Sequence, residues 1–144
     1  MSSLNIIKEP VASLRQKSVK IKEISPEIKR LVLAMADTMK TAKGVGLAAP
    51  QVGQNIRLCL ISTDKGPLAL INPKIIWKSL RKAVEEEGCL SCPDAYINVK
   101  RAKIIYIKCQ NEDGKEVSFK AKDFFARVIQ HEIDHLDGIL IIDK

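Results

Sequence analysis

Two histidines four residues apart form the strongest chemical pattern in the sequence. His131 and His135 are the only histidines of the chain, and Glu132 follows the first of them within Gln-His-Glu-Ile-Asp-His at 130–135. On a helix, residues four apart project from the same face, so both imidazoles can bind one metal ion. A glutamate beside the first ligand can act on a water molecule at that ion. The pattern therefore predicts a metal site with hydrolytic chemistry.

A catalytic site of this kind needs a third protein ligand and one open coordination position. Nine residues follow His135, and the acids among them, Asp137 and Asp143, are poorly placed to bind the same ion. We therefore expect the ligand upstream, where Cys89 and Cys92 lie in Glu-Gly-Cys-Leu-Ser-Cys-Pro. If Cys89 alone binds, a position remains for water. If both cysteines bind, a closed structural zinc site with two thiolates and two imidazoles results.

The open site is the favoured alternative. If residues 86–92 are extended, side chains three apart point to opposite faces, so Cys92 turns away from an ion that Cys89 binds. A structural site also has no use for Glu132 beside its first histidine. We therefore expect Cys89 to be the third ligand.

A third segment, Gly-Val-Gly-Leu-Ala-Ala-Pro-Gln-Val-Gly at 44–53, is rich in small residues. Small residues allow a close approach of backbone and ligand, and the side-chain amide of Gln51 offers hydrogen-bond donors. Taken alone, the segment is explained equally well as a tight turn that leaves a helix.

Two helices must position these segments. Residues 1–24 are expected to be an irregular or extended arm. Ser25-Pro26-Glu27 is typical of a helix start, and an apolar stripe at helical spacing continues until just before Gly44. A second helix is predicted over about 123–137, with Asp123 as N-cap and Gly138 as its stop.

Strands are predicted between and after the helices. Their ranges are 56–61, 68–72, 74–79, 82–88, 103–109, 116–121 and 139–142, with a hairpin loop at 111–115. Clustered strands between separated helices indicate the α+β class. We expect small antiparallel or mixed β-sheets packed around a central metal-binding helix, together with the N-terminal helix.

Length and composition favour a single globular domain over residues 1–144. Apolar residues make up 46% of the chain and charged residues 28%, which is ordinary for such a domain. The net charge of +7 favours weak attraction to polyanions. Because the lysines are spread along the chain and aromatic residues are few, we expect no specific nucleic-acid binding.

No stretch of the sequence has the length and apolarity of a membrane span, and the start shows no signal peptide. We therefore expect a cytoplasmic protein, with an organellar matrix as the alternative. In such a compartment the cysteines stay reduced or bind metal. Cys59 and Cys109 are expected to be small buried residues on strands.

The three chemical segments together resemble the peptide deformylase family. Its motifs Gly-x-Gly-x-Ala-Ala-x-Gln, Glu-Gly-Cys-Leu-Ser and Gln-His-Glu-x-Asp-His appear complete and in order, at 44–51, 87–91 and 130–135. The resemblance covers nearly the whole chain. It implies a hydrolase that removes the formyl group from the N-terminal methionine of newly synthesised polypeptides and releases formate.

The resemblance also implies roles at the site. Cys89, His131 and His135 hold the metal, Glu132 is general base and acid, and Gln51 and the backbone N–H of Leu90 bind the oxyanion. The implied native ion is Fe(II), with Zn(II), Ni(II) or Co(II) as substitutes. Physical chemistry agrees with these roles, because a divalent ion lowers the pKa of water and preorganised donors stabilise developing negative charge.

The methionine side chain of such a substrate needs an apolar pocket. Val128 lies one helical turn before His131 and is expected to line it, with Val45 and Leu90 nearby. Gly46 is a candidate for backbone contact with the substrate peptide.

Two positions depart from the family pattern. Cys92 stands where an aliphatic residue is usual, which keeps the structural zinc module open as a rival and creates an oxidation hazard. Arg127 stands where an apolar residue is common; we expect it to reach solvent, or else to lie at the pocket mouth. A metallopeptidase that cleaves internal bonds is a further rival.

Many bacterial relatives have a C-terminal helix that is associated with ribosome docking; because nine residues follow His135, we expect no counterpart of it here. We therefore expect at most a transient ribosome contact, through the positive charge.

Overall fold

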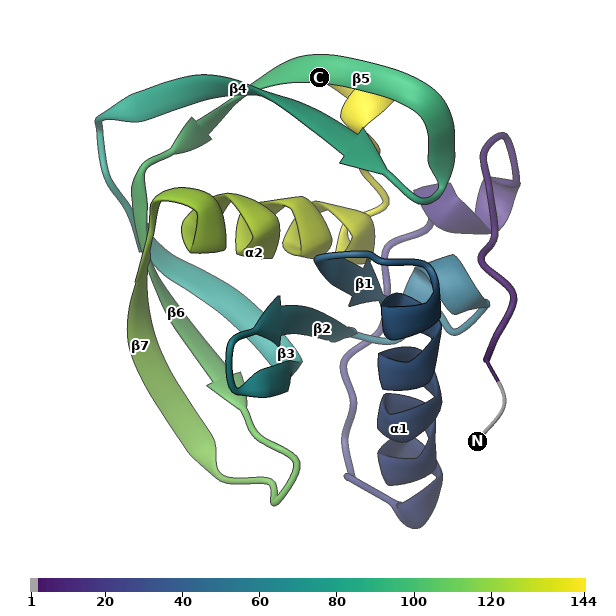
Figure 1. The fold of residues 1–144 in the computed structure, drawn as a ribbon. Coiled ribbons are helices and arrows are strands. Elements are labelled where there is room, and N and C mark those ends of the chain that lie inside the picture. The colour runs from purple at the N-terminus through teal and green to yellow at the C-terminus, as the bar shows by residue number, and fades with distance from the viewer. Residues whose placement is uncertain (1–2) are drawn as a thin grey trace.

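The computed structural model describes residues 3–144, in which two α-helices and seven strands form an α+β fold (Figure 1). The helices are α1 Pro26–Thr41 and α2 Asp123–Leu136. The strands are β1 Gly46–Ala48, β2 Leu58–Thr63, β3 Gly66–Lys78, β4 Lys82–Cys89, β5 Cys92–Ala102, β6 Ile104–Gln110 and β7 Glu116–Lys122. Short 3-10 helices cover Ala12–Arg15, Ala49–Val52 and Ile141–Asp143. Residues 1 and 2 of the expected arm and domain lie outside the described part.

The strands form two antiparallel sheets on either side of α2. Five strands pair in the order β1-β2-β3-β6-β7, and β4 pairs with β5 in a separate hairpin. Helix α2 runs between the large sheet and the β4–β5 hairpin, while α1 lies beside β1 and β2 (Figure 1). The expected fold class, small sheets around a central helix with an N-terminal helix, is confirmed.

Helix α1 begins and packs as its sequence predicts. The Ser25 hydroxyl accepts a hydrogen bond from the N–H of Ile28 at 3.4 Å, which satisfies one free donor of the first turn. The stripe residues Val32, Met35 and Met39 are buried against the large sheet.

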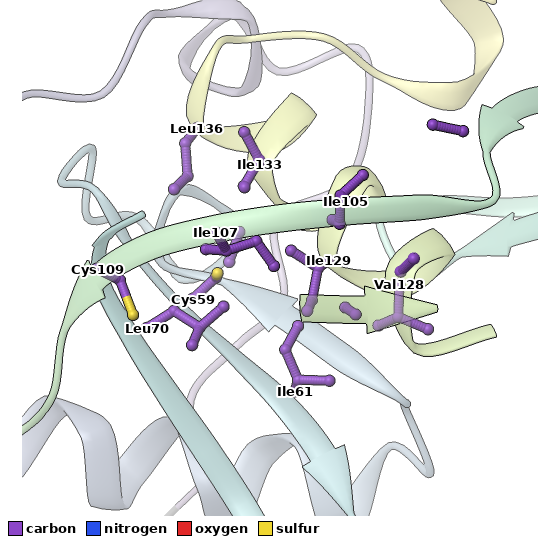
Figure 2. Packing of buried hydrophobic residues seen from close by; sticks show 14 residues of the cluster. Cys59, Ile61, Leu70, Ile105, Ile107, Cys109, Val128, Ile129, Ile133 and Leu136 are labelled. Atoms are coloured by element: carbon purple, nitrogen blue, oxygen red, sulfur yellow. The ribbon is translucent and has the colours of Figure 1, made fainter. Parts of the chain in front are cut away.

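Helix α2 buries an apolar face in the main core (Figure 2). Ile129, Ile133 and Leu136 pack against the inner face of the large sheet, where Cys59 and Cys109 are also buried. Burying an aliphatic side chain of this size contributes about 1.5–3 kcal/mol. The core therefore fixes the rotation of α2, and with it the direction in which His131 and His135 point.

The ends of α2 agree only in part with expectation. Asp123 is not the N-cap: it is the first helical residue with a φ of 53°, and the capping position is Lys122, which makes no side-chain cap. At the other end, Gly138 has a φ of 77°, and a side chain there would meet the carbonyl of Arg15. Glycine is needed at this turn for both reasons.

Other sequence expectations were wrong about strands. The ranges 68–72 and 74–79 fall almost entirely in one strand, β3, with an irregularity between Ile71 and Lys74. There the side-chain amide of Asn72 hydrogen-bonds the backbone of Ile21, and its backbone N–H donates to the Arg57 carbonyl. Residues 139–142 form no strand, because the N–H of Leu140 bonds the carboxylate of Asp143 and starts a 3-10 turn.

Within residues 3–144, neither helix has the length and apolar character required to span a membrane.

Candidate metal centre

Three side chains of types that can bind metal meet at the end of β4 and the C-terminal half of α2. The ligand atoms of Cys89, His131 and His135 all lie within 4.8 Å of one another. The Cys89 Sγ is 3.2 Å from the His135 Nε2, and the two imidazole rings are 5.0 Å apart. Because α2 packs against both sheets, helix and hairpin bring these residues together across 46 positions of sequence.

The donor set fits a divalent cation. The Nδ1 of His131 hydrogen-bonds the Glu87 carboxylate at 3.0 Å, an arrangement that fixes the ring and leaves Nε2 for a ligand. The Nδ1 of His135 is buried and has no hydrogen-bond partner among the described residues. One thiol and two imidazoles facing one point are a donor set suited to several transition metals.

The expectation that an extended chain turns Cys92 away from the ion was wrong. Residues 86–92 are not extended throughout: the chain turns at 90–91, so Cys89 and Cys92 face each other as a register pair. Cys92 nevertheless lies outside the donor group, buried in an apolar cluster with Leu14 and Val99. Burial, and then the neighbouring Cys89, raise the pKa of the Cys92 thiol to about 12.

Glu132 is buried beside the three donors. Its Oε1 has no hydrogen-bond partner within the described residues. Burial raises the pKa of its carboxyl to about 7, against the opposing effect of His131 and Arg101. A carboxyl group that gains and loses a proton near neutrality suits general acid–base chemistry.

Gly46 leaves the space that the Glu132 carboxylate occupies. A Cβ at position 46 would lie 2.5 Å from Oε2 and 3.0 Å from Cγ of Glu132. Because Gly46 of β1 has no side chain, the Glu132 carboxylate can occupy this position.

Replacing Gly46 by Ala is expected to lower kcat/KM for the reaction proposed below by about 100-fold, because the methyl group displaces a reacting carboxylate by a sizeable fraction of an ångström. Formate release and the free energy of unfolding are the measurements. The stability cost of Gly46→Ala should shrink when Glu132 is also changed to Ala, which removes the Cγ, Cδ and Oε2 atoms that the new methyl group would meet. An equal stability cost in both backgrounds would contradict this contact.

Gln51 lies in the 3-10 helix Ala49–Val52 and is buried. Its Oε1 accepts from the N–H of Ala48 at 2.9 Å, which orients the amide. Its Nε2 donates to the Ser91 hydroxyl at 3.1 Å and lies 3.8 Å from the Cys89 Sγ. The amide therefore points toward the donor group.

The N-terminal arm joins the two segments that carry Gln51 and Leu90. The N–H of Ile7 donates to the Gln51 carbonyl at 2.7 Å, and the Ser91 hydroxyl donates to the Ile7 carbonyl at 2.6 Å. The N–H of Glu9 then bonds the Ser91 carbonyl at 2.8 Å. Sequence reasoning missed Ser91, because no local pattern reveals a partner 84 residues away.

Glu87 is the second residue that sequence reasoning missed. Its buried carboxylate accepts two hydrogen bonds from Arg101, at 2.8 and 2.9 Å, and one from Arg127 at 2.5 Å. It also hydrogen-bonds the His131 ring. Burial alone would raise the pKa of Glu87, but its hydrogen bonds, that from Arg101 first, hold the pKa well below its usual range. A carboxylate so placed would orient His131 and stay ionised.

The expectation that Arg127 reaches solvent was wrong. The side chain is buried and donates to Glu87, to Glu85 and to the carbonyls of Val99 and Ala83. It fastens α2 to the β4–β5 hairpin while also lining the edge of the cavity described below. The signal that could have found it is its pairing with an acid in a neighbouring motif, since buried cations are almost always paired.

Replacing Glu87 by Gln is expected to cost about 3–5 kcal/mol of unfolding free energy at neutral pH, because two buried guanidinium groups lose their shared anion. Glu85→Gln is the matched control: Glu85 also bonds Arg127 but its side chain is 61% exposed, so its loss should cost at most about 1 kcal/mol. Urea unfolding of both variants measures the difference. Equal costs would contradict the assignment.

The contribution of Glu87 to the free energy of unfolding should depend on pH. Because the pKa of Glu87 is depressed by folding, its stabilising contribution is complete above its ordinary pKa of 4.5 and is lost as the pH falls below that value. The wild-type protein should therefore lose more unfolding free energy than Glu87→Gln when the pH is lowered from neutrality to about 3.

The two histidines differ in how readily they take a proton. Burial by itself would lower the pKa of His131, but the charge on Glu132 and the contacts with Cys89 and Glu87 raise it to about 10. For His135, burial and then the charge on His131 lower the pKa to about 3. A cation that binds His131 must displace its proton, so metal affinity should rise with pH.

A cavity of about 980 Å³ opens beside the donor group. Its lining includes Cys89, His131 and Glu132 together with the sequence-predicted pocket residues, which are Val45, Gly46, Leu90 and Val128. Val45 is half exposed and Leu90 half buried, so both present apolar surface to the opening. The cavity size is in the range of ligand-binding sites.

The central helix places two imidazoles and a carboxylate next to a thiol, and an open cavity lies beside them. This arrangement is typical of one class of protein, the metal-dependent hydrolases with a His-Glu-x-x-His helix.

Comparison with known proteins narrows the class. The polypeptide deformylase family model matches residues 3–144. A peptide deformylase from Dictyoglomus thermophilum is 46% identical over 131 residues, which cover 91% of this chain and 85% of that protein. The crystal structure of peptide deformylase from Thermotoga maritima has a TM-score of 0.96 and 39% identity, covering 99% of this chain and 97% of that one.

A third similar structure contains a bound peptide. The Met-Ala-Ser-bound crystal structure of the class I type b peptide deformylase from Acinetobacter baumannii has a TM-score of 0.93 and 31% identity, covering 98% of this chain and 97% of that one. The chain belongs to the polypeptide deformylase family.

Proposed function

We propose that the site described above carries out the reaction of this family: hydrolytic removal of the formyl group from the N-terminal methionine of new polypeptides, with release of formate. This assignment rests on one observation: Cys89, His131 and His135 meet beside the buried Glu132 carboxylate, whose Oε1 has no hydrogen-bond partner among residues 3–144.

Cys89, His131 and His135 would hold one divalent cation. When bound, the cation supplies Lewis-acid chemistry, lowering the pKa of water and polarising a carbonyl oxygen. Glu87 would keep the His131 ring in the orientation that binding requires. The three protein ligands leave the cavity side open, which a hydrolase needs and a structural site does not.

Glu132 is the general base and then the general acid. Its carboxylate takes a proton from the attacking water and returns it to the departing amine nitrogen. The pKa of about 7 supports both steps, because neither the ionised nor the protonated form is strongly disfavoured near neutral pH. Gly46 maintains the position of the carboxylate.

Gln51 and the backbone N–H of Leu90 stabilise the negative charge that develops on the formyl oxygen. The amide of Gln51 has two donor hydrogens; one donates to Ser91, and the other points toward the Cys89 sulfur, from which it would turn to the substrate oxygen. Each such donor is worth roughly 2.7–4 kcal/mol in transition-state stabilisation.

The cavity receives the methionine side chain. Val45, Leu90 and Val128 offer an apolar lining for it, and Gly46 is positioned for backbone contact with the peptide. The Met-Ala-Ser peptide in the structure of the Acinetobacter baumannii relative supports a cavity of this kind for this chain.

For the native ion we propose Fe(II), with Zn(II), Ni(II) or Co(II) able to replace it. One thiolate and two imidazoles suit all four ions, so the choice rests on family resemblance. Metal analysis of protein purified without oxygen tests it, since zinc in place of iron under those conditions would overturn the proposal.

We propose N-formylmethionyl nascent peptides as the partner of this protein. We propose the cytoplasm, or an organellar matrix, as the compartment in which it binds them. A transient ribosome contact through the net charge of +7 would be purely electrostatic, so co-sedimentation with ribosomes that survives high salt would contradict it. Membrane association and sequence-specific nucleic-acid binding are not part of this proposal.

We further propose that residues 1–144 act as a single catalytic domain, because α2 packs against both sheets.

The decisive experiment is formate release from formyl-Met-Ala-Ser by anaerobically purified protein. We expect turnover of the formylated peptide and no reaction with the same peptide carrying an acetyl group. Cleavage of unformylated peptides at internal bonds without formate release would instead support a metallopeptidase.

A further inference from the structure

Cys89 and Cys92 face each other across the turn of the β4–β5 hairpin. Cys89 is the last residue of β4, Cys92 is the first of β5, and the two are register partners. Directly opposed residues of antiparallel strands have Cα atoms about 4.5–5.5 Å apart, within the range of about 4.4–6.8 Å that a disulfide bridges. Both are free thiols.

The two thiols differ in access. Both thiols line the open cavity, but Cys89 is partly exposed, whereas Cys92 is 2% exposed and packs in an apolar cluster beside it. An accessible thiol with a second cysteine directly behind it is the arrangement in which oxidation ends in a disulfide and goes no further along the oxidation series. The remaining cysteines, Cys59 and Cys109, are buried in the main core, away from the cavity lining (Figure 2).

We propose that Cys89 and Cys92 form a reversible disulfide when the protein meets hydrogen peroxide, and that this bond switches the site off by removing Cys89 from the metal-binding group. The loss of activity rests on the proposed role of Cys89 as a ligand; the formation of the bond rests only on the hairpin.

The chemistry balances in two steps. The Cys89 thiolate attacks one peroxide oxygen, so an S–O bond forms, the O–O bond breaks and hydroxide leaves, which oxidises Cys89 to the sulfenic acid and reduces peroxide. The Cys92 sulfur then attacks the Cys89 sulfur: the S–S bond forms, the S–O bond breaks, and the departing hydroxide takes the Cys92 proton and leaves as water. A dithiol reverses the result by thiol–disulfide exchange.

The test treats metal-loaded wild-type protein with hydrogen peroxide and follows four readouts: formate release, cation release to a chromogenic chelator, the number of free thiols, and the disulfide found by peptide mapping. We expect loss of two of the four thiols, a Cys89–Cys92 link, stoichiometric cation release and at least about a tenfold loss of activity. Dithiothreitol should restore activity to within about twofold when the cation is resupplied.

Cys92→Ser separates the switch from simple damage. Without the resolving thiol, Cys89 should proceed to the sulfinic acid, and inactivation should no longer be reversed by dithiothreitol. Cys109→Ala, which removes a different buried thiol, should behave like wild type. Recovery of Cys92→Ser equal to that of wild type, or mapping that finds Cys92 still free, would overturn the proposal. Thiol counts and mapping do not depend on turnover, so a failure of the proposed function remains distinguishable from a failure of the disulfide.

Discussion

Formate release should fall by about 100- to 10,000-fold when Glu132 is replaced by Gln, while the bound metal stays in place. The amide has nearly the same size and still fits beside Gly46, but it cannot accept the proton of the attacking water or return it to the amine. Steady-state kinetics on formyl-Met-Ala-Ser and metal analysis of the same preparation measure the two quantities.

The matched control is Glu112→Gln, the same substitution in the loop between β6 and β7, which should leave both quantities unchanged. If Glu132→Gln lost its metal together with its activity, the carboxylate would be a ligand or a structural support. If it kept full activity, the proton transfer would have to be assigned elsewhere.

Metal binding should distinguish the two cysteines of the hairpin. Cys89→Ser is expected to weaken metal affinity by at least about 100-fold and to abolish turnover, because a ligand is lost and not only its support. Cys92→Ser should keep its metal and most of its activity. It should lose only about 1–3 kcal/mol of unfolding free energy, from a hydroxyl placed in an apolar cluster.

Competition with a chelator of known affinity measures both variants, and the free energy of unfolding shows whether each is folded. Equal loss of metal from the two variants would mean that both sulfurs bind the ion. The site would then be a closed structural one, and the hydrolytic assignment would fail.

The parts of the fold that the sequence revealed are those with local signals. Ser25 and Pro26 mark the start of α1, and Gly138 marks the end of α2, because capping and left-handed turns are decided by neighbouring residues. The spacing of His131 and His135 indicated that both face one point. The grouping with Cys89 could be inferred because the acids that follow His135 are poorly placed and because residues 87–91 match a motif of the family that the chain resembles.

What the sequence did not reveal depends on distant partners. The Glu87 carboxylate is ionised and central only because Arg101 and Arg127 arrive from β5 and α2. The strand β5 was not predicted, since its alternation is weak and it pairs only with β4. The turn at 90–91 reversed the expected geometry of Cys92, which an extended chain would have turned away.

The arm that precedes α1 has a practical consequence for work with this protein. Through Ile7 and Glu9 it bridges the segments that carry Gln51 and Leu90, the two oxyanion donors that we propose, and Leu4 and Ile6 line the cavity. We therefore expect a purification tag placed ahead of this arm to obstruct the proposed entrance of the peptide and to disturb the hydrogen bonds that join those segments. Affinity handles belong after Lys144, and screening of inhibitors should use protein with an unmodified beginning.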